Sequence, residues 1–171
     1  FPHAHDYASG NPGATNVLRT GNRKGAMLTL VGAGVKGFAD VFAVQLCAAA
    51  FALPPWTVPA AALAVFVGHL YPVYFHFRGG KGVATAAGIV FAFNWPLGLA
   101  LTLVWLVMAF GFKISSLAGL VTAILLPLGM FYQVGPTLSS WACVAIAVLL
   151  VWRHRENIRK LVSGRETAIG R

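Results

Sequence analysis

Six apolar runs, separated by short polar turns, make up most of the chain. They lie at 26–51, 58–75, 83–93, 95–112, 114–131 and 138–152. At a rise of about 1.5 Å per residue, five of these runs approach or exceed the roughly 30 Å of a bilayer core if they are helical. The run at 83–93 covers only about 16 Å as a helix and needs tilt or a thinned site to cross. The pattern therefore predicts a bundle of membrane-crossing helices.

Composition agrees with lipid as the solvent of this bundle. Hydrophobic residues make up 58% of the 171 residues and charged residues 10%, whereas roughly 25% of the residues of a soluble domain are charged. Cys47 and Cys143 lie inside apolar runs without ligand-like spacing, so neither a disulfide framework nor a metal site is indicated. We expect an all-α, polytopic integral membrane bundle that forms one domain over residues 1–171.

The net charge of +9 is informative first about the orientation of the bundle in the membrane and only then about a binding partner. The predicted turns at 52–57, 94 and 133–137 contain no charged residue, and twelve of the thirteen Lys and Arg residues fall on the other side of the membrane. The positive-inside rule makes that side cytoplasmic. Contact with anionic membrane lipids is enough to explain the positive charge. We therefore do not expect nucleic acid as a partner.

Lys36 is the one basic residue inside a predicted span. Asp40 follows four residues later, on the same face of a helix, so the spacing predicts a neutralising ion pair. A functional charge inside the membrane is the alternative.

The two ends of the chain are polar. Residues 1–22 contain no apolar stretch typical of a signal peptide. The basic segment 153–171 carries Ile158, Leu161 and Val162 at helical spacing, so we expect it to lie on the membrane surface.

The first polar segment on the cytoplasmic side is SGNPGATNVLR, residues 9–19. Its small hydroxyl and amide side chains, its backbone N–H groups and the guanidinium of Arg19 can bind a phosphate or a carboxylate. Taken alone, the segment is equally typical of a capped turn that enters a helix.

The second segment is GHLYPVYFHFRGGKGVAT, residues 68–85. Its glycines permit close approach of the backbone to a ligand, the following helix offers its positive N-terminal end, and Lys81 adds a point charge. It lacks the glycine spacing of a Walker A loop and the Ser or Thr that follows the lysine there. A glycine turn between packed helices is the alternative.

The third segment is RHRENIRKLVSGRE, residues 153–166. His154 and Asn157 are three apart and share a face of a helix, whereas Glu156 points elsewhere. A histidine at a membrane surface is usually a solvated polar residue. A His and an Asn that project together toward two anion-binding loops could instead orient a polyol.

Together the three segments resemble the motif regions of the bacterial acyl-phosphate:glycerol-3-phosphate acyltransferases, the PlsY family. Their order, their spacing and the apolar runs between them also fit, so the resemblance covers essentially the whole chain. It implies a seven-helix fold whose first helix would precede Phe1, so that six membrane segments are expected here. The family tends to carry an acidic residue at the position of Ala33.

The resemblance implies transfer of a fatty acyl group from acyl phosphate to glycerol 3-phosphate, giving lysophosphatidic acid and phosphate in phospholipid biosynthesis. It places the protein in the bacterial inner membrane with its active site at the cytoplasmic face. No cofactor and no obligate protein partner are expected. Such a reaction needs one apolar slot open to lipid and two anion sites near the cytoplasmic surface.

Residue roles follow from the resemblance. Phosphates would be held by Arg19, by Lys81 and by the N–H groups around Gly79, Gly80 and Gly82. Substrates would be oriented by Ser9, Asn11, Thr15 and Asn16, and the glycerol moiety would be bound by His154 and Asn157. Ser116 either joins these residues or caps a helix.

Two questions stay open at the level of the sequence. Either His154 or the phosphate of the donor takes the proton of the attacking hydroxyl, and the scarcity of acids and bases favours the donor. A transporter or channel for a phosphorylated solute is the alternative function. Transporter sites normally lie near the bilayer midplane, whereas Arg19, Lys81, His154 and Asn157 lie at segment ends, which favours an enzyme.

Overall fold

The computed structural model describes residues 13–169, which fold into helices joined by short loops. In chain order the helices are α1 (Ala14–Arg19), α2 (Arg23–Ala50), α3 (Thr57–Leu70), the 3-10 turn η2 (Val73–Phe75), α4 (Val83–Phe93), α5 (Trp95–Phe112), α6 (Ser115–Val134), α7 (Leu138–Arg153) and α8 (Arg155–Val162). All six predicted apolar runs are thus helical, and the all-α prediction is confirmed.

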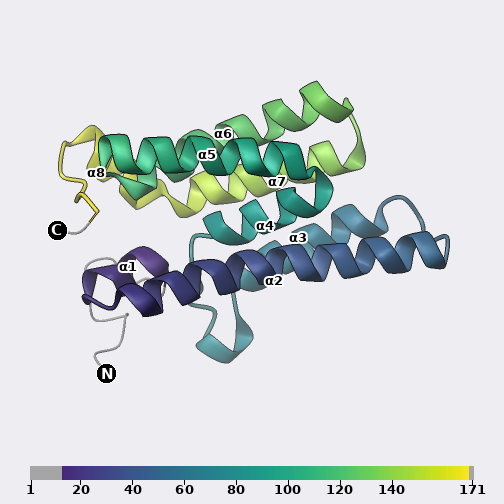
Figure 1. Ribbon diagram of the computed structural model, residues 1–171, viewed down its shortest axis with the longest axis horizontal. Coiled ribbons are helices and arrows are strands. Elements are labelled where there is room, and N and C mark those ends of the chain that lie inside the picture. Colours follow the sequence, from purple (N-terminus) through teal and green to yellow (C-terminus); the bar gives the residue numbers. More distant parts are fainter. Residues whose placement is uncertain (1–12, 170–171) are drawn as a thin grey trace.

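The long helices form two layers with α4 between them (Figure 1). One layer contains α2 and α3, the other contains α5, α6 and α7, and α4 packs on both α2 and α5. The short helices α1 and α8 lie at the same end of the bundle (Figure 1). Polar segments that are far apart in the sequence therefore meet at that end.

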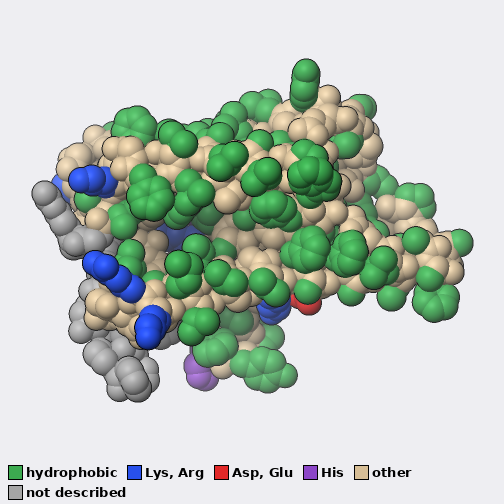
Figure 2. Space-filling view, viewed as in Figure 1, with side chains coloured by type: hydrophobic (Ala, Val, Ile, Leu, Met, Phe, Trp, Pro, Cys, Tyr) green, Lys and Arg blue, Asp and Glu red, His purple; other side chains and the backbone are tan. Residues whose placement is uncertain are grey.

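The outer surface of the bundle is apolar, as expected for a protein surrounded by lipid. Large side chains such as Phe110, at 77% exposure, point outward, and Figure 2 shows hydrophobic side chains over most of the visible face. Four segments are long and apolar enough to cross a membrane: Arg23–Ala50, Thr57–Phe75, Trp95–Phe112 and Ser115–Val134. The helices Val83–Phe93 and Leu138–Arg153 are apolar but shorter.

Helix α3 ends earlier than the apolar run that predicted it. The run continues to residue 75, whereas the helix ends at Leu70, with Tyr71 at φ −132° and ψ 61°. Pro72 accounts for this end, because proline has no N–H to donate and disfavours the helical conformation in the residue before it. The segment 71–82 is consequently a loop that contains η2 and the glycines of the second motif.

Helices α2 and α4 approach each other closely at three glycines. A Cβ added to Gly88 would meet the carbonyl oxygen of Gly34, and one added to Gly37 would meet that of Thr85. Small residues at a helix crossing allow the backbones to approach in this way. The crossing fixes the first turn of α4 beside Lys36, the neighbour of Gly37.

The predicted ion pair between Lys36 and Asp40 does not form. Within residues 13–169, the ion pair present is that of Glu156 with Arg159, at 3.1 Å. Both Lys36 and Asp40 are exposed in the isolated chain. Helical spacing made the pair possible, but Lys36 lines a pocket beside α2 instead.

The basic tail is more than a surface helix. After α8 the chain turns back over the start of α6, where the N–H of Ile169 donates to the carbonyl of Lys113 at 2.6 Å. The expectation of a tail on the membrane surface omitted this return, which brings Glu166 to the polar end of the bundle.

Candidate functional site

A polar pocket of about 360 Å³ lies where the three motif segments meet. Its walls come from α1, from one face of α2, from the end of α3, the loop 71–82 and the first turn of α4, from the start of α6, from the junction of α7 and α8, and from residues 166–167. Nine of the predicted site residues line it: Thr15, Asn16, Gly79, Gly80, Lys81, Gly82, Ser116, His154 and Asn157. The structure therefore brings together the three motifs that the sequence singled out.

A second cavity, of about 530 Å³, opens beside the polar pocket and is lined almost entirely by apolar side chains of α2, α4, α5 and α6. Four residues border both cavities: Leu30, Val83, Ala84 and Trp105. The N–H nitrogen of the Trp105 indole is buried and has no hydrogen-bond partner among the described residues. The two cavities thus meet at a point where a polar environment changes to an apolar one.

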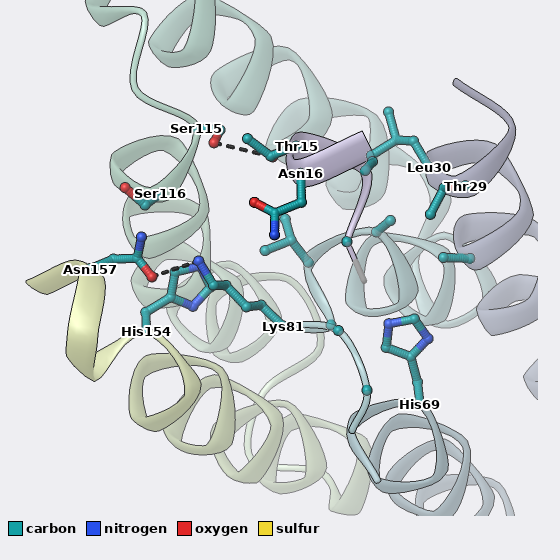
Figure 3. Close-up of a pocket in the computed structure, with 18 of the residues that line it drawn as sticks. Thr15, Asn16, Thr29, Leu30, His69, Lys81, Ser115, Ser116, His154 and Asn157 are labelled. Carbon is teal, nitrogen blue, oxygen red and sulfur yellow. Dashed lines mark hydrogen bonds between the residues drawn. The ribbon is translucent and has the colours of Figure 1, made fainter. Parts of the chain in front are cut away.

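A hydrogen-bonded chain crosses one side of the polar pocket. The ammonium of Lys81 donates to the Asn157 amide oxygen at 2.6 Å, and the Asn157 amide nitrogen donates to the Glu166 carboxylate at 2.7 Å. The hydroxyl of Ser116 donates to the same oxygen of Glu166 at 2.7 Å. Figure 3 shows Lys81 extending from the glycine loop toward Asn157, beside His154. The network fixes a cation, an amide and a hydroxyl around one space.

His154 lies at the break between α7 and α8 and is only 1% exposed. Its Nδ1 lies 2.8 Å from the Leu150 carbonyl oxygen. A carbonyl only accepts, so Nδ1 carries the hydrogen and Nε2 is the free acceptor. Burial is the main cause that lowers the pKa of His154 to about 4; the charges of Lys81 and Arg153 act in the same direction, and the Leu150 carbonyl and Glu166 act in the opposite direction. The ring is therefore neutral near pH 7.

The lowered pKa of His154 predicts a loss of stability in acid. In the unfolded chain the ring titrates near its ordinary value of 6.5, so the unfolded state binds more protons between about pH 6.5 and 4. The free energy of unfolding should fall as the pH decreases through this window, by up to about 3 kcal/mol from this group. Thermal unfolding in detergent at pH 7.5 and 4.5 measures the loss. A His154→Gln variant should show a smaller difference between the two pH values, and an equal difference would contradict the prediction.

The glycines of the second motif are required by close packing. A Cβ on Gly79 would meet the carbonyls of His69 and Leu70, and one on Gly80 would lie 2.8 Å from the His69 ring. Gly82 has φ +87°, a conformation that residues with a side chain rarely adopt, and a Cβ there would lie 2.5 Å from Phe66. The loop is thus pressed against the C-terminal end of α3.

Arg153 holds the same loop from the other side. Its guanidinium donates to the carbonyls of Gly79 at 2.9 Å and Gly80 at 3.2 Å, and it lies over the ring of Tyr71. These two hydrogen bonds tie the loop to the end of α7 at the entrance to α4. The positive N-terminal end of α4 faces the site from there.

The first motif contributes the opposite wall. The Thr15 hydroxyl lies 3.3 Å from the Ser115 hydroxyl at the start of α6, and Asn16 is 3% exposed (Figure 3). Ser9 and Asn11 lie outside the residues that the structure describes, and so does the side chain of Arg19, the last residue of α1.

Sequence reasoning was wrong about one alternative and missed two residues. Ser116 does not cap α6, because Ile114 occupies the capping position and no side chain caps that helix. Glu166 and Arg153 were treated as parts of the basic tail, although both bind residues of the site. The signal for Glu166 was its rarity, since it is one of only four acidic residues in the chain.

Known proteins resemble this chain in sequence and in fold. Residues 3–164 match the family described as glycerol-3-phosphate acyltransferase. A curated protein of that name from Burkholderia ambifaria (strain MC40-6) is 54% identical over 166 residues, which are 96% of this chain and 76% of the relative. One from Paraburkholderia phymatum is 52% identical over 164 residues, which are 96% of this chain and 78% of the relative.

Two crystal structures of PlsY (YgiH), an integral membrane glycerol 3-phosphate acyltransferase, have the same architecture. The glycerol 3-phosphate form superimposes with a TM-score of 0.90 at 37% identity, over 98% of this chain and 82% of that chain. The lysophosphatidic acid form gives a TM-score of 0.86 at 38% identity, over 95% of this chain and 81% of that chain.

Proposed function

Because the chain belongs to the glycerol-3-phosphate acyltransferase family and is an integral membrane acyltransferase of glycerol 3-phosphate, we propose that its acyl donor is an acyl phosphate. The products are then lysophosphatidic acid and inorganic phosphate. A glycerol hydroxyl oxygen bonds to the acyl carbon, the bond from that carbon to the phosphate oxygen breaks, and the hydroxyl proton leaves on the phosphate.

The observation that carries this proposal is the meeting of the polar pocket with the apolar cavity. An acyl phosphate has an apolar chain and an anionic head, and its reactive carbonyl carbon lies where the two join. The polar pocket and the apolar cavity meet in the same way, at a border formed by Leu30, Val83, Ala84 and Trp105. The apolar cavity, bordered by α2 and α5, matches the slot that the donor chain needs.

Glycerol 3-phosphate fits the side of the pocket that holds the hydrogen-bonded network. Ser116, Asn157 and Glu166 present a hydroxyl, an amide and a carboxylate, the groups that bind a polyol. His154 adds the acceptor Nε2 beside them. Thr15 and Asn16 complete the opposite wall, and Ser9 and Asn11 are proposed to orient the substrates from the first motif.

Charge that develops during transfer is stabilised at the glycine loop. Lys81 supplies a cation there, and the N–H groups around Gly80 and Gly82 lead into the positive end of α4. The N–H of Gly79 donates to the Leu70 carbonyl at 3.2 Å and so helps to hold the loop against the end of α3. Arg19 is proposed to reach the phosphates from the end of α1. These groups act as preorganised donors, because the glycine packing and Arg153 hold the loop in place before substrate binds.

The donor phosphate itself accepts the proton. A histidine with a pKa of about 4, buried against Leu150, is a weak base near pH 7. The mixed anhydride is already an activated acyl donor, and its leaving phosphate becomes more basic as the bond breaks. We therefore assign His154 to binding and orientation of the glycerol moiety.

The site lies at the end of the bundle that gathers the basic residues, including α1 and α8 (Figures 1 and 2). We propose that this end is cytoplasmic, as the positive-inside rule favours, and that the membrane is the bacterial inner membrane. Glycerol 3-phosphate then enters from the cytoplasm, and the donor enters from the bilayer.

A comparison of acyl donors tests the proposal. Purified protein is incubated with labelled glycerol 3-phosphate and, in parallel, with acyl phosphate or with the corresponding acyl thioester. We expect labelled lysophosphatidic acid with acyl phosphate and at least about 100-fold less with the thioester, since a thioester brings no phosphate to accept the hydroxyl proton and His154, with a pKa of about 4, is a weak base near pH 7. Product from the thioester alone would reject the acyl phosphate donor.

A further inference from the structure

We propose that the indole N–H of Trp105, in α5, donates a hydrogen bond to the carbonyl oxygen of the acyl substrate and stabilises the negative charge that this oxygen carries during transfer. This inference rests on the proposed function for the position of the acyl chain in the apolar cavity. It assigns a substrate contact to a side chain that lies outside the three motif segments.

Trp105 is a border residue whose polar atom has no partner. Within residues 13–169, two buried side-chain polar atoms lack a hydrogen bond: the indole nitrogen of Trp105 and the hydroxyl oxygen of Thr85. Thr85 lines neither cavity, whereas Trp105 lines both. A buried donor without an acceptor costs about 1–3 kcal/mol. A ligand that brings an acceptor to this border therefore forms a hydrogen bond without breaking another.

The other polar side chains in the lining of the apolar cavity are satisfied within their own helices. The hydroxyl of Thr102 donates to the Gly98 carbonyl at 2.8 Å. The hydroxyl of Thr122 donates to the Ala118 carbonyl at 3.0 Å. Both are the bonds to the preceding helical turn that threonine commonly makes. Among the described residues that line this cavity, Trp105 thus has the one side-chain donor available to a ligand.

The position of Trp105 matches that of the carbonyl group in the acyl substrate. The carbonyl joins the apolar chain to the anionic head, and Trp105 lies where the apolar cavity meets the polar pocket. A Cβ added to Gly119 of α6 would lie 3.1 Å from Val83 and 3.4 Å from Nε2 of His154. Because Val83 belongs to the same border, the ring that is proposed to orient the glycerol moiety lies beside it. A carbonyl carbon at the border is thus within reach of the glycerol hydroxyl.

A neutral donor such as an indole N–H matches the carbonyl rather than the phosphate. The phosphate is an anion and matches the cations beside the glycine loop, such as Lys81. The carbonyl oxygen receives the electron pair of its π bond when the glycerol oxygen bonds to the carbon. That pair re-forms the carbonyl as the bond to the phosphate oxygen breaks, and the indole keeps its proton throughout. A fixed donor in an apolar environment stabilises such a transient charge more strongly than water does.

Replacing Trp105 by phenylalanine tests this contact. Phenylalanine keeps an aromatic ring at the border but removes the N–H, so kcat should fall about 100-fold, as when one donor to an oxyanion is lost. The KM for glycerol 3-phosphate should change less than about twofold. The matched control is Trp95→Phe, because Trp95 lies in the same helix, is 67% exposed and lines neither cavity. An unchanged kcat in Trp105→Phe would overturn the proposal.

Two unreactive analogues separate the carbonyl contact from ring packing and from the choice of acyl donor. A β-ketophosphonate keeps the chain, the carbonyl and the anionic head of acyl phosphate, and an alkylphosphonate of equal length lacks only the carbonyl. We expect Trp105→Phe to weaken binding of the first about fivefold and of the second less than about twofold. Equal losses for the two analogues, or no loss for either, would reject the contact. A loss confined to the β-ketophosphonate, in a protein that fails to use acyl phosphate, would reject that donor and keep the contact.

A second replacement keeps the shape of the side chain if Trp105→Phe does not fold. Benzothienylalanine in place of Trp105 retains the double ring and carries sulfur where the indole has its N–H. Circular dichroism first establishes that each variant is folded. The sulfur variant should lose kcat and β-ketophosphonate affinity to the same extent as Trp105→Phe, whereas full activity in the folded protein would overturn the proposal.

Discussion

Replacing Lys81 by methionine is expected to lower kcat/KM for acylation of glycerol 3-phosphate by about 1,000-fold, or roughly 4 kcal/mol. The ammonium donates to Asn157 at 2.6 Å and stands between the glycine loop and the network that ends at Glu166. Methionine has a similar length but removes the charge that is proposed to stabilise the leaving phosphate, and it leaves the Asn157 amide oxygen without the hydrogen bond from Lys81. Steady-state rates with both substrates varied measure the loss.

The Lys81 prediction has two controls. Lys81→Arg keeps the charge but not the compact ammonium, so it should restore activity only in part. Lys24→Met removes an exposed lysine that does not line the pocket and should leave kcat/KM within about twofold, as surface substitutions do. A Lys81→Met enzyme that kept more than a tenth of the wild-type kcat/KM would remove Lys81 from its proposed role.

Replacing Gly79 by alanine is expected to lower kcat/KM by at least about 100-fold and to lower the unfolding temperature by several degrees. The added methyl group would collide with the carbonyls of His69 and Leu70, which belong to the rigid end of α3. Backbone cannot move aside as a flexible side chain can, so the loop itself must shift. A shift of about 1 Å in groups that stabilise a transition state costs on the order of 100-fold in rate.

Gly32→Ala is the matched control for this experiment. Nothing lies within 4 Å of a Cβ at Gly32, which is inside α2 and outside the pocket lining. Alanine favours a helix over glycine by up to about 1 kcal/mol, so this variant should be as stable as the wild type or more stable, and fully active. Normal activity in Gly79→Ala would show that the loop tolerates displacement and would contradict its preorganisation.

The sequence predicted the helices well because the bilayer leaves few alternatives. Each backbone polar group must be satisfied inside its own segment, so a long apolar run in lipid is a helix. The early end of α3 was the main difference, and Pro72 was the visible reason for it. Residues at motif positions met in one pocket because successive turns alternate between the two ends of the bundle, which places all three motif segments at the same end.

Long-range contacts of single side chains could not be predicted in the same way. Glu166 reaches Ser116 across 50 positions of the sequence, and Arg153 reaches Gly79 across 74. Neither contact leaves a periodic signal. The spacing of Lys36 and Asp40 suggested a local ion pair, but Lys36 lines the pocket instead. The packing of α2 on α4 decides between an ion pair and a place in the pocket, and the sequence does not show this packing.

The unequal lengths of α2 and α3 bear on how the donor is supplied. Helix α2 has 28 residues and α3 has 14, so they extend about 42 Å and 21 Å. A short loop joins the two helices, so the glycine loop at the end of α3 lies beside the middle of α2 and not at its N-terminal end. We therefore expect a lipid-like donor to reach this loop by lateral diffusion. The quantity that governs saturation is then the surface density of donor in the membrane, and added inert lipid dilutes the donor even when its bulk concentration is constant.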